Sequence, residues 1–72
     1  MYRNYYINTD SSSNPNRNNE VHVENCRYMP SVYNKKYLGR FDNALEAVAY
    51  AKRIGYLKAD GCIHCCPEAH RG

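Results

Sequence analysis

The sequence predicts a small α+β domain in which a small antiparallel sheet of about three strands packs on one helix, with a cysteine-rich knuckle at the C-terminus. Three observations support this class. Short β-prone segments occupy most of the first half of the chain, one segment with helical spacing follows them, and two cysteines with knuckle spacing follow the helix. The length of 72 residues allows one domain.

Three segments have the composition of strands. Residues 2–8 are aromatic and β-prone. Residues 20–25 alternate, with His22 between two glutamates on one face and two valines on the other. Residues 37–41 are predicted as a third, short strand that carries a glycine.

The remaining segments before and after the helix are predicted as irregular. Residues 9–19 are polar turn formers, which indicates a mobile surface loop between two strands. Residues 26–36 contain a proline that disfavours helix before it. Asp60-Gly61 is predicted as a turn, and residues 67–72 as a tail.

Residues 43–54 give the clearest prediction, an amphipathic helix. Asn43 is a favourable N-cap, and Glu46 three residues later approximates a capping box. Gly55 stands where a helix commonly ends in a left-handed glycine. The apolar residues that follow helical spacing are Leu45, Val48 and Ala49.

The composition predicts a weak core. Leu, Ile, Val and Phe together number eleven, and the eight tyrosines bring hydroxyls that need partners. A domain this small and poor in aliphatic residues usually needs a metal, a disulfide or oligomerisation. A large enzyme fold is excluded, no apolar run approaches the roughly 20 residues of a membrane span, and the first residues lack a signal-peptide pattern. We therefore expect a cytoplasmic protein.

The four cysteines favour a metal site over reduced thiols, and reduced thiols over disulfides, in that compartment. Cys62-x-x-Cys65, preceded by Gly61, has the spacing of a zinc knuckle, in which two thiolates share one tetrahedral ion. Two further ligands are needed. The candidates are His22, Cys26, His64, Cys66 and His70.

His22 and Cys26 can bind the same ion only if the chain between them is not extended. If residues 20–26 form a straight strand, His22 and Cys26 lie about 13 Å apart, whereas two zinc ligands lie roughly 4 Å from each other. Either the chain turns at Glu24-Asn25, or His22 is not a ligand.

The motifs His22-x-x-x-Cys26, Glu46-Ala47, Gly55-Tyr56 and Cys62-x-x-Cys65 resemble the metal-binding domain of bacterial Ada-type alkylation-repair proteins. They are equally similar to the Cys/His modules attached to some nucleases. The resemblance covers roughly residues 21–66 and implies one structural zinc, held by the His22, Cys26, Cys62 and Cys65 side chains.

Two departures limit what the resemblance implies. His22 stands where the Ada-type methyl-accepting cysteine would be, so methyl transfer is not implied. The 35 residues between Cys26 and Cys62 exceed the usual family spacing. The chain is also similar to short stand-alone bacterial and phage Cys-His proteins, which imply no activity.

The middle of the chain is basic and aromatic, without an acidic residue over 26–41. Cations pair with phosphates, and aromatic faces stack on bases; the alternative is a solvated loop whose tyrosines cover a small core. The candidate ligand-binding residues are Arg27, Tyr28, Tyr33, Asn34, Lys35, Lys36, Tyr37 and Arg40.

Three functional hypotheses follow. The leading one is a non-catalytic protein that captures a phosphate-bearing, nucleotide-like ligand between the protomers of a homo-oligomer, for example a phage-type protein that sequesters a nucleotide immune signal. The second is a zinc-stabilised nucleic-acid-binding module, and the third a protein inhibitor or adaptor. The sequence has no P-loop, dinucleotide or nucleophile-elbow motif, so we expect no enzyme.

Overall fold

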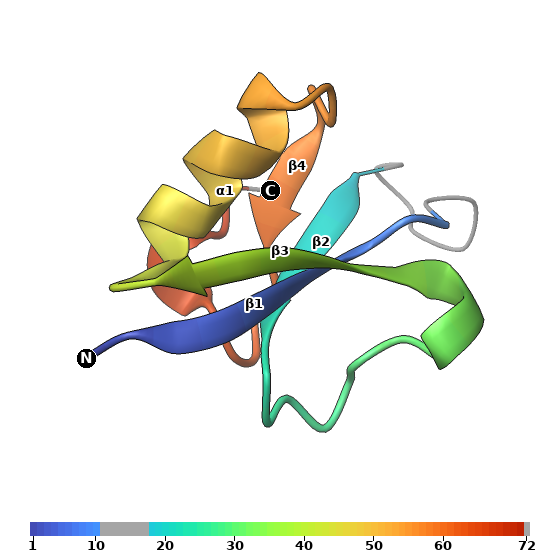
Figure 1. Cartoon of the computed structure of the whole chain (residues 1–72), viewed down its shortest axis with the longest axis horizontal. Coiled ribbons are helices and arrows are strands. Elements are labelled where there is room, and N and C mark those ends of the chain that lie inside the picture. Colours follow the sequence, from blue (N-terminus) through green and yellow to red (C-terminus); the bar gives the residue numbers. More distant parts are fainter. Residues whose placement is uncertain (11–17, 72) are drawn as a thin grey trace.

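The computed structural model describes residues 1–10 and 18–71, in which one helix packs on one face of a four-stranded sheet (Figure 1). This is the predicted α+β class. The elements are β1 (Arg3–Asn8), β2 (Asn19–Val23), β3 (Lys35–Phe41), α1 (Ala44–Arg53) and β4 (Ala59–Gly61), with two 3₁₀ turns, η1 (Val32–Asn34) and η2 (Pro67–Ala69).

The sheet has the order β3-β1-β2-β4 and is mixed rather than antiparallel. β1 pairs antiparallel with β2 and with β3, whereas β4 runs parallel to β2. The prediction of about three antiparallel strands is therefore corrected: β4 covers the Asp60-Gly61 segment that was predicted as a turn. A strand of three residues is too short to show the alternation by which strands are predicted. Asp60 can be buried in this strand because its carboxylate accepts hydrogen bonds from the Arg71 amide and the Asn18 side chain.

The central strand β1 divides the sheet into two faces. Tyr5 and Ile7 point to the face that packs against α1 and are buried in the core. Tyr6 lies on the opposite face, which we call the open face. A bulge interrupts the β1–β3 register, because Tyr5 pairs with Gly39 but Tyr6 pairs with Tyr37. Gly39 has a φ of 132°, which a side chain rarely tolerates.

The ends of α1 confirm the predicted helix. The Asn43 side chain accepts a hydrogen bond from the Glu46 amide at 3.0 Å, and Gly55 has the left-handed φ of 119° expected after a helix. The buried face differs from the prediction, since Leu45 is 48% exposed. The buried residues are Ala44, Ala47, Val48 and Ala51. Small alanine side chains let the helix approach the sheet closely.

Within the predicted tail of residues 67–72, residues 67–71 pack on the domain, and residue 72 lies outside the described residues. Ala69 of η2 is 2% exposed and belongs to the core, and His70 Nδ1 lies 3.0 Å from the Gly61 carbonyl oxygen. Most of the predicted 9–19 loop, residues 11–17, lies outside the described residues. No helix in the described part of the chain has the length and apolar character needed to cross a membrane.

Replacing Gly61 with alanine is expected to destabilise the protein. A Cβ there would lie 2.6 Å from the Cys66 carbonyl oxygen and 2.8 Å from the Ala69 Cβ, and overpacking of this kind costs about 1–3 kcal/mol. Urea unfolding measures the loss. Gly55→Ala is the control: nothing lies within 4 Å there, so only the left-handed backbone opposes it, at about 1 kcal/mol. A G61A variant more stable than G55A would contradict this packing.

Candidate metal centre

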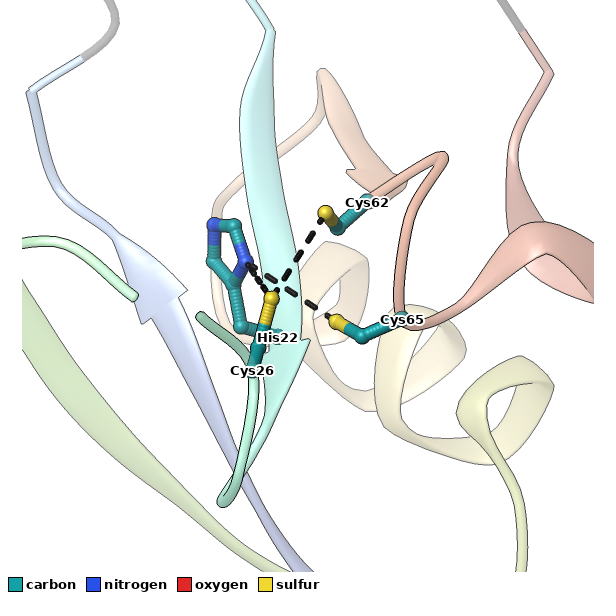
Figure 2. Close-up of side chains that lie close together, drawn as sticks. All are labelled: His22, Cys26, Cys62 and Cys65. Atoms are coloured by element: carbon teal, nitrogen blue, oxygen red, sulfur yellow. Dashed lines mark hydrogen bonds between the residues drawn. The ribbon is translucent and has the colours of Figure 1, made fainter. Parts of the chain in front are cut away.

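Four side chains from two distant parts of the sequence meet at one end of the sheet. The ligand atoms of His22, Cys26, Cys62 and Cys65 all lie within 4.8 Å of one another. His22 stands on β2 and Cys26 in the turn after it, while the other two cysteines follow β4 (Figure 2). Because β2 and β4 are parallel neighbours, both pairs leave the sheet at the same end.

A turn satisfies the distance condition that the sequence posed for His22 and Cys26. β2 ends at Val23, and the Cys26 amide donates a hydrogen bond to the Val23 carbonyl at 2.9 Å. The chain thus turns at Glu24-Asn25. The turn brings the Cys26 Sγ to 3.4 Å from the His22 Nδ1.

The spacing of the ligand atoms is compatible with a tetrahedral metal ion. The His22 Nδ1 lies 3.9 Å from the Cys65 Sγ, and the Cys26 and Cys62 sulfurs are 4.0 Å apart. Tetrahedral bonds of 2.0–2.3 Å separate neighbouring ligands by about 3.5–3.8 Å. Small side-chain shifts would therefore close four ligands around one ion.

Backbone amides surround the sulfurs. The Val23 amide donates to the Cys65 Sγ and the Tyr28 amide to the Cys26 Sγ, each at 3.4 Å. The amides of His64 and Cys65 face the Cys62 sulfur and oppose the rise in its pKa. Hydrogen bonds of this kind favour the thiolate, which is the metal-binding form.

Burial sets the protonation of the metal-free site. It raises the pKa of the Cys62 and Cys65 thiols and lowers the pKa of the His22 imidazole. The imidazole is then neutral, the form that binds metals. The thiols hold their protons until an ion displaces them, so metal binding releases protons.

Glu20 is a residue of the site to which the sequence assigned no role. Its Oε1 lies 3.8 Å from the His22 Nε2, the ring nitrogen that points away from the sulfurs in Figure 2. A carboxylate that accepts a hydrogen bond from a ligating histidine fixes its ring orientation and tautomer, and Glu20 lies within a small shift of that distance. The alternation of residues 20–25 already placed Glu20 and His22 on the same strand face, so the sequence contained the pattern that indicates this contact.

The other candidate ligands do not belong to this group of four. Cys66 is buried in the core, with its Sγ 3.6 Å from the Cys65 Sγ. His64 is exposed and stacks on the Tyr28 ring at a centroid distance of 4.2 Å. His70 contacts the Gly61 carbonyl.

The predicted ligand-binding residues do not form one patch. Arg27 and Tyr28 line a hollow beside the metal centre, and the Lys36–Ile7 pairing places Lys36 on the helix side of the sheet. Tyr33 and Asn34 belong to η1, where Tyr33 is 91% exposed. Three residues of β3 share the open face with Tyr6: Lys35, Tyr37 and Arg40.

Comparisons with protein-family models, curated proteins and solved structures found no match to this chain. The Ada-type resemblance therefore stays a prediction. The chemistry of the site rests on its geometry, and that geometry agrees with the ligand set which the resemblance implied: His22, Cys26, Cys62 and Cys65.

The four-ligand set predicts one zinc ion per chain. Native mass spectrometry of protein that was purified without chelators is expected to show the mass of the chain plus one zinc ion. Cys62→Ser is expected to abolish zinc binding and to lower the melting temperature. Cys66→Ala is the matched control, since it removes a buried neighbouring thiol that is outside the ligand set. Equal loss of zinc in both variants would contradict the assignment.

The metal-free protein is expected to lose stability as pH rises. Burial raises the folded-state pKa of Cys62, Cys65 and Cys66, so the folded chain holds thiol protons more tightly than the unfolded chain. The resulting stabilisation is complete below the unfolded thiol pKa of about 8.5 and is lost above it.

Melting temperatures in chelator between pH 7 and 10 measure this loss. Saturating Zn²⁺ is expected to reverse the trend near neutral pH, because protons then compete with the ion for thiolates. Identical pH profiles with and without zinc would contradict the site.

Proposed function

We propose that Zn²⁺ occupies the centre formed by His22, Cys26, Cys62 and Cys65. Three thiolates and one imidazole in a tetrahedral arrangement are a typical ligand set for zinc. With four protein ligands the coordination shell is closed, as in structural sites, because no position remains for a substrate. The proposed role is structural and non-catalytic.

The composition of the core supports a structural role for the metal. Among the residues that the structure describes, two of the five largest fully buried side chains, His22 and Cys62, are proposed ligands. The core facing α1 consists largely of alanines and a few aliphatic residues. In small domains a structural zinc contributes on the order of 10 kcal/mol to folding, which would compensate for this small core.

We further propose that the open face of the sheet binds single-stranded nucleic acid. The observation that carries this proposal is an aromatic pair flanked by cations: the Tyr6 and Tyr37 ring centroids are 5.3 Å apart, and the Lys35 Nζ lies 4.9 Å from the Tyr6 ring centroid. Arg40, opposite Asn4 on the same face, adds a second cation.

This arrangement suits unpaired bases. Exposed aromatic rings on a sheet are a common platform for stacking the bases of single strands, and neighbouring Lys and Arg side chains bind the phosphates. Tyr37 is 51% exposed, and its hydroxyl donates a hydrogen bond to the Asn4 side chain at 2.8 Å. The ring is therefore both accessible and held in orientation.

Capture of a single nucleotide-like ligand is the second candidate function. A hollow of about 260 Å³, lined in part by Tyr28 and Asn34, favours it. Pockets that bury small molecules well are usually about 300–1,000 Å³, so this hollow alone encloses too little, and the hollow beside Arg27 and Tyr28, at about 360 Å³, lies at the lower end of that range. In this candidate a second protomer completes the enclosure, and a metal-free oligomer carrying a nucleotide-sized adduct in native mass spectrometry would favour it over the nucleic-acid module.

Two variants separate stacking from charge on the open face. Tyr37→Ala is expected to weaken binding of fluorescent single-stranded DNA or RNA about 5- to 150-fold, since stacking contributes roughly 1–3 kcal/mol per base. The double variant Lys35→Ala/Arg40→Ala is expected to reduce the slope of log affinity against log salt by about 1.4, because each phosphate contact contributes about 0.7.

Lys52→Ala/Arg53→Ala is the matched control, because it removes the same charge from the last turn of α1. Its salt slope should equal that of the unaltered protein. If both double variants reduce the slope equally, binding is not located on the open face; if no oligonucleotide binds, the nucleic-acid proposal fails.

A further inference from the structure

A polar hollow of about 260 Å³ adjoins the open face of the sheet. Its lining includes two carboxylates, Asp10 and Glu20, and the amides Asn8 and Asn34. His22, which is 1% exposed, also lines it. The hollow thus lies between the proposed metal centre and the proposed stacking surface.

The strand register places Glu20 beside the stacking surface. Tyr6 pairs with His22 across the β1–β2 ladder, and Glu20 is the preceding residue on the same face of β2. Its side chain is 31% exposed, so a ligand can reach the carboxylate from solvent. A base that stacks on the exposed Tyr37 ring would lie on the same face of the sheet as this carboxylate.

Charge is divided across the open face in a way that orients a nucleotide. The cations Lys35 and Arg40 lie on β3, whereas Glu20 lies on β2, two strands away. Phosphates are attracted to the first strand and repelled by the second. The sugar-phosphate backbone would therefore follow β3, and the base edges would point toward β2.

The Glu20 carboxylate lies beside the proposed metal centre. His22 directs Nδ1 to the sulfurs and Nε2 to Glu20, at 3.8 Å from Oε1. A ligated imidazole keeps its proton on the second nitrogen, so its N–H would point toward the carboxylate, and a shift of less than about 1 Å would form the hydrogen bond. Each carboxylate oxygen has two lone pairs, so this contact leaves acceptor capacity for a ligand in the hollow that Glu20 lines.

We propose that Glu20 recognises guanine. An ionised carboxylate only accepts hydrogen bonds, and it does so through two oxygens. Guanine presents two adjacent donors, N1–H and the 2-amino group, on its Watson–Crick edge, whereas the other bases present a donor next to an acceptor. The inference rests on the proposed function and adds a base preference to it.

The test measures the affinity of the zinc-loaded protein for three single-stranded oligonucleotides. One is a uridine strand with isolated guanosines; in the other two, inosine, which lacks the 2-amino group, or adenosine replaces guanosine. The guanosine strand is expected to bind about tenfold more tightly than either, the size of a typical base-edge contact. Glu20→Gln is expected to reduce this difference below about twofold, because its amide offers one acceptor and one donor.

Glu24→Gln is the matched control, because it removes the same charge from a residue just after β2. The Glu24 carboxylate accepts a hydrogen bond from the Asn4 amide. It should keep the guanine preference. Zinc content and melting temperature of both variants test whether Glu20 acts only on the metal centre: a Glu20→Gln protein that loses zinc and weakens binding to all three strands equally would overturn the inference. So would an unaltered protein that binds all three equally, whereas no binding at all would overturn the proposed function itself.

Discussion

The parallel pairing of β2 with β4 is the constraint on which the rest of the structure depends. It places the ends of two strands next to each other, so that His22 and Cys26 meet Cys62 and Cys65 although 35 residues separate Cys26 from Cys62. Close packing of Gly61 against η2 fixes the path of the second pair. An ion at this point would connect the middle and the end of the chain, and its stabilisation would grow from closing that long loop.

The two faces of the sheet differ because α1 covers only one of them. Alanines of α1 pack closely on Tyr5, Ile7 and the β2 valines, which produces a thin core with few large side chains. The opposite face carries Tyr6, Tyr37 and Lys35, whose rings and ammonium group contact one another. Sheet alternation thus separates the core residues from the aromatic and basic side chains proposed to bind a ligand, while His22 lies on the same face as Tyr6 and is buried there.

His22 connects these two roles. Its buried ring directs one nitrogen to the sulfurs and the other to Glu20, which borders the open face. His22 is thus the side chain that lies between the metal ligands and the proposed binding surface.

The sequence alone determined the features that depend on neighbouring residues. The strand alternation around His22, the Asn43 cap and the Gly55 helix end were predictable because backbone preference and hydrogen bonding act over a few positions. Tertiary structure decided the remaining features, which depend on contacts between distant segments. A three-residue β4 has no pattern of its own, the buried helix face is set by the sheet beneath it, and the proposed role of Glu20 follows from the direction of one imidazole ring.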